Sequence, residues 1–182
     1  MHHDSDVMDE SVIVNGNDTL RNVFVTISKG LKGWQFPTPQ EAVVLDQVGC
    51  TYEPHVVGLQ VGQELRVRNS DQVTHNVHAY AKKNDSFNQG QVKDGADIVR
   101  VFEYREVIDV KCDLHGWMSA FVGVSDHPFY AVTGNDGAFD LGLLPEGEYT
   151  VKATHEVYGA QKAKITIGAD EIATLDFTFA DE

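Results

Sequence analysis

The chain has 182 residues, of which 42% are hydrophobic, and its formal net charge is −14 at neutral pH. This length fits one domain or two small ones and is sufficient for a buried core. The negative charge argues against nucleic acid as a partner, because phosphate requires a basic surface, and no apolar run reaches the ~20 residues that span a bilayer. A metal cation or a positively charged protein suits this charge better.

The N-terminal segment, residues 1–10, reads MHHDSDVMDE and has no apolar stretch. We expect it to be a disordered tail, with His2 and His3 as a tag remnant or part of the tail rather than a site. Because it lacks the hydrophobic region of a signal peptide, we expect the sequence to be a mature form or a shortened form of the protein.

The remainder predicts an all-β protein. Short β-branched or alternating runs are bounded by Gly, Asp, Asn and Pro, and no window shows a helical stripe. The polar, Gly- and Asn-rich segment 80–98 is predicted to be a surface loop with one helical turn. The expected strands lie within 22–27, 43–48, 55–69 on both sides of a turn at Gly62, 149–156, 163–168 and 173–179.

The middle of the chain resembles a cupredoxin of the plastocyanin type. The matching features appear in order: YEP at 52–54, VGQELRVRNSD at 61–71, HNV at 75–77, and KCDLHGWM at 111–118. The resemblance covers nearly half of the chain and implies a Greek-key β-barrel or sandwich over residues 40–126.

The flanking regions resemble the transthyretin-like domain found beside carboxypeptidases. Residues 129–159 carry Thr-x-x-Asp-Gly-x-Phe and Pro-x-Gly-x-Tyr, and the features of that domain's opening strands lie in 12–30. The implied sandwich would therefore comprise 11–39 and 127–182, split by the cupredoxin. Insertion of a domain at a loop costs little free energy, because the entropy of loop closure grows only logarithmically with loop length. Strands from 12–28 should then pair with strands from 129–179. Bacterial plastocyanin-like proteins combine both parts.

The cupredoxin resemblance implies a copper site. Blue-copper sites use two imidazoles and one thiolate in a trigonal set, with a weak thioether above it. By the resemblance, His75 is the early histidine ligand, and Cys112, His115 and Met118 are the loop ligands. The Cys-x-x-His-x-x-Met spacing is shorter at the Met end than in plastocyanin, and a two-residue gap before Met also occurs in binuclear CuA loops. Taken singly, each residue could be a core or surface residue.

Neighbouring residues have supporting roles in this interpretation. Asn76 matches the cupredoxin Asn that ties the two ligand loops together. Trp117 is expected to pack beside the site or to cover it. His78 is expected to be structural or exposed, and His55 to be a surface imidazole, with a second metal as the alternative. His127 and His155 are assigned no chemistry.

The sequence thus predicts a copper electron-transfer protein rather than an enzyme, because four protein ligands leave no open position for a substrate. The expected cofactor is one copper ion, with a second possible, and the expected partner is a redox protein such as a c-type cytochrome. The resemblance implies a periplasmic or extracellular location. The alternatives are a copper-binding or copper-sensing protein without redox turnover, and a structural module with a Cys50–Cys112 disulfide.

Cys50 leaves three possibilities open. It could be a buried thiol beside the site, it could bridge a second copper together with Cys112 in a CuA-like centre, or it could form the disulfide with Cys112. The disulfide requires Cα atoms within ~7 Å of each other.

Overall fold

The computed structural model describes residues 10–169 and 171–180, and these residues form an all-β protein. The expected tail, including His2 and His3, lies almost entirely outside the described residues. Among the described residues there is no helix long and apolar enough to cross a membrane. The described part of the chain forms thirteen strands: β1 (Phe24–Lys29), β2 (Val43–Val48), β3 (Thr51–Glu53), β4 (Val56–Gln60), β5 (Glu64–Asn69), β6 (His75–Tyr80), β7 (Phe87–Gln91), β8 (Ile98–Val101), β9 (Glu106–Lys111), β10 (Ser119–Ser125), β11 (Tyr130–Val132), β12 (Gly147–His155) and β13 (Gly159–Ile167).

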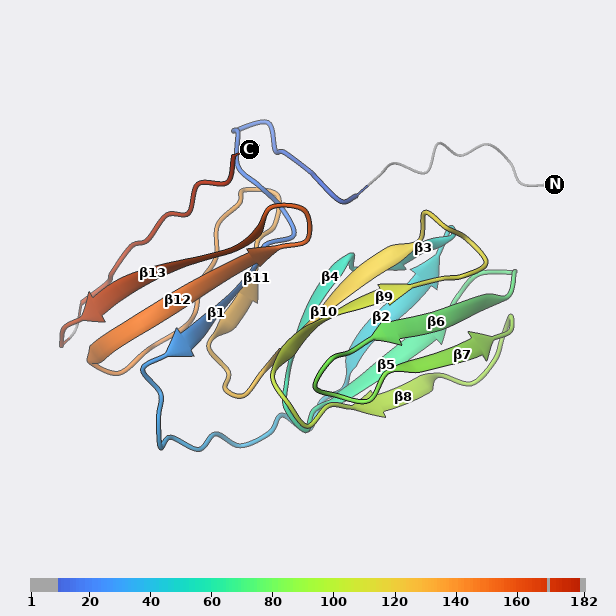
Figure 1. The fold of residues 1–182 in the computed structure, drawn as a ribbon, viewed down its shortest axis with the longest axis horizontal. Coiled ribbons are helices and arrows are strands. Elements are labelled where there is room, and N and C mark those ends of the chain that lie inside the picture. The colour runs from blue at the N-terminus through green and yellow to red at the C-terminus, as the bar shows by residue number, and fades with distance from the viewer. Residues whose placement is uncertain (1–9, 170, 181–182) are drawn as a thin grey trace.

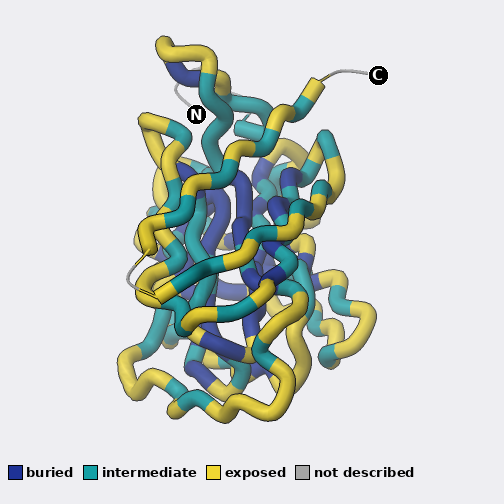
Figure 2. Tube along the Cα trace, turned by 90° about the vertical axis from the view of Figure 1, so that its left-hand side faces the viewer, coloured by how far each residue is buried: buried dark blue, intermediate teal, exposed yellow. Residues whose placement is uncertain are grey.

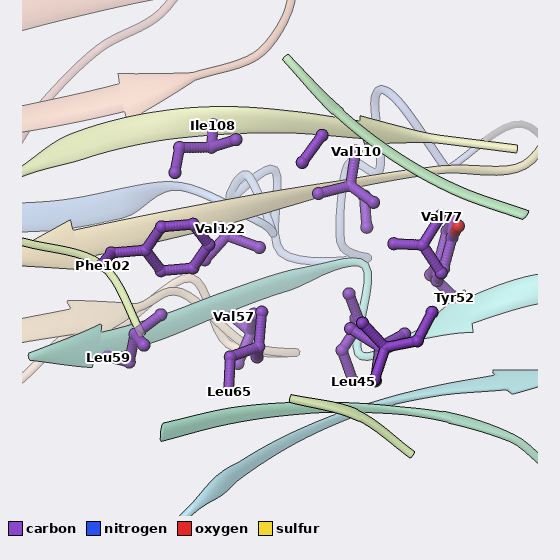
Figure 3. Packing of buried hydrophobic residues seen from close by; sticks show 14 of the residues in the cluster. Leu45, Tyr52, Val57, Leu59, Leu65, Val77, Phe102, Ile108, Val110 and Val122 are labelled. Carbon is purple, nitrogen blue, oxygen red and sulfur yellow. The ribbon is translucent and has the colours of Figure 1, made fainter. Parts of the chain in front are cut away.

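Strands β2 to β10 build a two-sheet lobe, on the right in Figure 1. One sheet has the order β4-β10-β9-β6-β7 and the other the order β3-β2-β5-β8. Their inward-facing side chains interdigitate in one apolar core, which includes Leu45, Leu65, Ile108 and Val122 (Figure 3). Buried segments run through the interior and exposed ones form the loops (Figure 2). This core is the rigid support for the loops at one end of the lobe.

The connection at Gly62 joins two different sheets. β4 pairs with β10 and β5 pairs with β2, both in parallel. Gly62 has a φ of +80°, a left-handed conformation that glycine adopts without steric cost, and its N–H donates to the carbonyl of Phe102. The two strands around Gly62 thus form a crossover between layers rather than a hairpin.

The ends of the described chain meet in a single-sheet lobe with the strand order β11-β1-β12-β13. Strand β1 pairs antiparallel with β11, where Phe24 is opposite Val132, and with β12, where Phe24 is opposite Thr154. The expectation that a strand of 12–28 pairs with strands of 129–179 is therefore confirmed. The strands of the two-sheet lobe lie between these partners in the sequence.

The single-sheet lobe differs from the expected sandwich. One face of its sheet carries the core residues Val25, Ile27 and Val151, and irregular segments rather than a second sheet cover that face. Residues 173–179 were expected to be a strand but form no ladder. Their side chains alternate between exposed and partly buried, and Leu175 and Phe177 pack on the core. An alternation with a period of two shows only that one side of a segment is buried. An extended segment without a pairing partner shows the same alternation.

The expectation for residues 80–98 is also wrong in part. Instead of a helical turn, this segment contains the edge strand β7, which pairs antiparallel with β6. Its residues are mostly exposed and include Gly90, so the apolar alternation that identifies strands is absent. β7 is a strand because its backbone hydrogen-bonds to the backbone of β6, although its side chains do not have the pattern of a strand.

The two lobes meet where glycines allow close approach. A Cβ on Gly123 would lie 2.5 Å from the Phe24 ring, and one on Gly58 would lie 2.7 Å from the Tyr130 ring. The aromatic rings of Phe24 and Tyr130, from the single-sheet lobe, therefore pack directly against the backbone of β4 and β10 in the two-sheet lobe.

His127 links the lobes as a neutral imidazole. Its Nε2–H donates to the Ile27 carbonyl at 2.7 Å, so its Nδ1 is unprotonated and accepts from the Phe129 N–H at 3.2 Å. Burial lowers the pKa of His127, and burial likewise lowers the pKa of His155, whose Nδ1 accepts from the Val157 N–H at 3.2 Å. Protonation of either ring would abolish the acceptor that these N–H groups use.

We expect acid to destabilise the protein through these two histidines. In the folded protein the pKa values of His127 and His155 lie below the ~6.5 of the unfolded chain, so the unfolded chain binds more protons in acid. The contribution of the two neutral imidazoles to the free energy of unfolding is therefore complete above pH ~6.5 and is lost as the pH falls below that value. The free energy of unfolding should decrease by at most about 1.4 kcal/mol per pH unit for each histidine. Urea unfolding between pH 8 and 5 measures this slope. His127→Gln, which keeps a donor for Ile27, should flatten it, and an unchanged slope would contradict the assignment.

Candidate metal centre

His75 begins β6 and is fixed in one tautomer by a carboxylate. Its side chain has no exposed surface, and its Nε2 lies 2.8 Å from Asp71 Oδ2. Because a carboxylate accepts, Nε2 carries the proton and Nδ1 presents its lone pair on the other side of the ring. This is the arrangement by which carboxylates orient metal-binding imidazoles.

The loop between β9 and β10 brings a thiol and a second imidazole to that nitrogen. Cys112 Sγ lies 3.9 Å from His75 Nδ1 and 3.6 Å from His115 Nδ1, and the two Nδ1 atoms are 3.0 Å apart. With the bond lengths of zinc sites as a guide, ~2.0 Å to nitrogen and ~2.3 Å to sulfur, a trigonal set separates nitrogen from nitrogen by about 3.5 Å and nitrogen from sulfur by about 3.7 Å. The donor atoms of these three residues therefore fit one copper ion.

Met118 closes this loop at the start of β10. Its N–H donates to the carbonyl of His115 at 2.9 Å, and its carbonyl accepts from the Cys112 N–H at 3.0 Å. Only 2% of Met118 is exposed. The loop is thus a tight turn whose two ends, Cys112 and Met118, are held side by side at the edge of the core to which both side chains belong.

Asn76 joins the two segments that carry the candidate ligands, as the cupredoxin resemblance implies. Its Oδ1 accepts from the Asp113 N–H at 2.7 Å and from the Cys112 thiol at 3.4 Å. Its Nδ2 donates to Asp113 Oδ2 at 3.0 Å. These bonds fix Cys112 relative to β6, so the thiol and His75 do not move independently.

Cys50 lies at the same end of the lobe, in the turn between β2 and β3. Both cysteines are free thiols. The Cys50 sulfur and one ring nitrogen each of His75 and His115 lie within 4.8 Å of one another. Burial raises the pKa of the Cys50 thiol, and the charges of Asp71 and Cys112 raise it further. The disulfide alternative is not formed, and Cys50 is close enough to be a further ligand.

Trp117 forms part of the outer surface of this end. It is 56% exposed, its ring lies 5.4 Å from that of His115, and its Nε1–H donates to the Cys50 carbonyl at 3.1 Å. The exposed Leu114 belongs to the same loop. Trp117 packs beside the site and connects the ligand loop to the Cys50 turn.

Two histidines outside the candidate ligand set differ in their surroundings. His78 is half-buried on β6 and, as expected, has a structural role: its Nδ1 lies 3.0 Å from Asp113 Oδ1. His55 was expected to be a surface imidazole but is buried, with Nε2 against Glu156 of the other lobe and Nδ1 3.8 Å from Glu10. Sequence reasoning missed this contact because His55 and Glu156 are far apart in the chain.

Comparisons with known proteins concern about half of the chain. No protein-family model matches it, and a search of curated proteins finds no match. Similar solved structures include a copper-containing nitrite reductase from Thermus scotoductus SA-01 (19% identity, 50% of this chain, 24% of that chain, TM-score 0.44). They also include amicyanin from Paracoccus versutus (25% identity, 56% of this chain, 97% of that chain, TM-score 0.41). A third is a purple cupredoxin from Nitrosopumilus maritimus (23% identity, 46% of this chain, 98% of that chain, TM-score 0.39).

Proposed function

We propose that the protein is a copper-binding electron carrier with a mononuclear site formed by His75, Cys112, His115 and Met118. The observation that carries this proposal is the convergence of one thiol and two imidazole Nδ1 atoms within 3.9 Å of one another. One soft and two borderline ligands suit both Cu(I) and Cu(II), so bound copper would accept and release single electrons.

The residues of the chain keep the site rigid between the two oxidation states. Asp71 holds the His75 ring, and Asn76 holds the Cys112 sulfur. Fixed ligands lower the rearrangement that accompanies each electron, which favours a carrier over a catalyst. Because Cys112, His75 and Met118 are buried and only His115 is half-buried, we propose that electrons pass through the His115 face.

We propose a redox protein, such as a c-type cytochrome, as the partner. The exposed side chains of Leu114 and Trp117 beside His115 offer an apolar contact surface. The net charge of −14 favours a positively charged partner and a faster encounter at low ionic strength. We further propose a periplasmic or extracellular location, with the copper domain over 40–126 inserted into a transthyretin-like domain of 11–39 and 127–182.

The position of Cys50 favours a second candidate, a binuclear CuA-like centre that includes this thiol. The visible and EPR spectra after addition of Cu(II), with the copper stoichiometry, test both candidates. We expect one copper per chain, an intense thiolate-to-copper band, and retention of that band in Cys50→Ser. Two coppers with a mixed-valence signal that this substitution abolishes would favour the binuclear centre. A pale complex would indicate copper binding without redox turnover.

Met118→Leu tests the axial ligand. Leucine has nearly the same volume, so the core is preserved, but it cannot donate to copper. The weak thioether favours Cu(II) more than Cu(I), so we expect the reduction potential to rise by about 60 mV or more, a tenfold change in relative affinity. Voltammetry on the fully loaded variant measures this shift. An unchanged or lower potential would show that Met118 is not axial.

A further inference from the structure

The two cysteines share the same pair of imidazoles. Cys112 Sγ lies within 3.9 Å of both His75 Nδ1 and His115 Nδ1, and the Cys50 sulfur forms a second group with one ring nitrogen of each histidine, all within 4.8 Å. Each set contains one thiol and two imidazoles. The chain therefore presents two overlapping three-donor sets rather than one ligand set and an isolated cysteine.

The two thiols differ in their access to solvent. Cys112 is 3% exposed and belongs to the core cluster, whereas Cys50 is half-buried in the turn between β2 and β3. His75 is fully buried and His115 is half-buried. Cys50 and His115 are thus the donors that an incoming ion can reach from solvent, and His75 and Cys112 are the donors behind them.

The turn that carries Cys50 is tied to the site through Asp71. Gly49 and Cys50 have φ values of +63° and +59°, the left-handed pair of a two-residue hairpin turn. Asn, Asp or Gly is usual at such positions, because other side chains are sterically unfavourable in the left-handed region. Asp71 accepts from the Gly49 and Cys50 N–H groups at 2.6 and 2.8 Å while it also binds His75. One carboxylate therefore holds the thiol turn and the shared imidazole in a fixed relation.

Cu(I) is the ion that this arrangement suits. It is soft, and thiolate ligands select for it. Binding at Cys50 would release one thiol proton to solvent. Transfer to Cys112 would then exchange one thiolate for the other, since both histidines are common to the two sets, and the Cys112 proton would replace copper on the Cys50 sulfur. No electron is transferred in this exchange.

We propose that Cys50, His75 and His115 form a loading site for Cu(I), from which the ion passes to Cys112. This inference rests on the proposed copper function of His75, Cys112 and His115. It assigns to Cys50 a role in acquiring the metal rather than in holding it during electron transfer.

The test measures Cu(I) uptake rather than electron transfer. Four proteins are compared under anaerobic conditions: the unmodified chain, Cys50→Ser, Cys112→Ser and the double variant, with Cys50→Asn as a control that suits the left-handed turn. Each is mixed with Cu(I) held by a chromophoric chelator, and the loss of the chelate colour gives both rate and stoichiometry. Thermal unfolding verifies that each variant is folded.

We expect Cys112→Ser to retain one Cu(I) per chain and the double variant to retain none. Cys50→Ser and Cys50→Asn should reach one Cu(I) per chain at a rate lowered by about tenfold or more, because the accessible thiolate is absent. Equal retention by Cys112→Ser and the double variant, or an unmodified loading rate in both Cys50 variants, would overturn the inference. So would two Cu(I) ions held at once by the unmodified chain.

These outcomes are separable from failure of the proposed function. If the unmodified chain, loaded with Cu(I) and then oxidised, develops no intense thiolate-to-copper band, the electron-carrier proposal fails whatever the loading rates are. If that band develops and the Cys50 variants load at the unmodified rate, only the loading site fails.

Discussion

Cys112→Ser is expected to lose the intense visible band of the copper-loaded protein by at least about tenfold, because that band requires a thiolate on Cu(II) and a hydroxyl is a hard, weakly donating group. Serine is nearly isosteric with cysteine, and its hydroxyl can still donate to Asn76 Oδ1, which the thiol approaches at 3.4 Å. The fold should therefore survive. Absorption and EPR spectra of the Cu(II) protein measure the change, and the circular dichroism spectrum verifies the fold.

Cys50→Ser is the matched control for this substitution, since it removes the other thiol of the chain. We expect it to keep the band, because the trigonal set of Cys112, His75 and His115 is complete without it. If Cys112→Ser stays intensely coloured while Cys50→Ser becomes pale, Cys50 rather than Cys112 is the principal thiolate ligand.

Asp71→Asn should weaken copper binding about 10- to 100-fold, the usual cost of losing a group that orients a metal-binding histidine. The carboxylate accepts hydrogen bonds from His75 and from two N–H groups of the Cys50 turn, at 2.6–2.8 Å. An amide has the same shape but only one accepting oxygen, so at least one of these donors loses its partner. Competition with a chelator of known affinity measures the loss.

Asp46→Asn is the control for the change in charge. Asp46 lies on β2, where its carboxylate accepts from the Ser70 hydroxyl at 2.8 Å rather than from a candidate ligand. We expect this variant to bind copper with the affinity of the unmodified chain. Equal losses in both variants would show that the effect of Asp71 is one of net charge, and no loss in Asp71→Asn would show that His75 is oriented without it.

The proximity of three candidate ligands was predictable from their short-range spacing. Cys112, His115 and Met118 lie in one loop, so their proximity follows from the sequence once a strand ends before Cys112 and another begins after Met118. His75 required the family resemblance, since nothing local places β6 beside β9. The role of Asp71 was missed, although its position four residues before His75, in the turn leading into the strand, is the signal that could have identified it.

The fold was less predictable where side-chain patterns and backbone pairing diverge. β7 has the polar composition of a loop but completes the ladder of β6. Residues 173–179 have the alternation of a strand but no partner. In both cases the deciding factor is whether a neighbouring backbone offers free N–H and C=O groups, which the sequence of the segment itself does not contain.

The contact of His55 with Glu156 was unpredictable for a different reason. The two residues belong to different lobes, and each local sequence, EPHVV and THEVY, reads as an ordinary strand end. Their meeting depends on how the lobes dock, which is set by the seating of Phe24 on Gly123 and of Tyr130 on Gly58. Packing of this kind depends on the shapes of two assembled sheets, so neither local sequence contains a periodic pattern that predicts it.

The pairing of β1 with β11 and β12 predicts an order of folding. Val23 donates to the hydroxyl of Thr133, 110 positions further along the chain, so the central strand of the single-sheet lobe has no partner until most of the chain is present. Direct pairing of such distant segments would be slow, because the conformational entropy of the long intervening loop is lost before the contacts form. A two-sheet lobe that folds first brings its own two ends together and so converts a distant encounter into a local one. We therefore expect the two-sheet lobe to act as the folding template for the lobe that surrounds it in sequence.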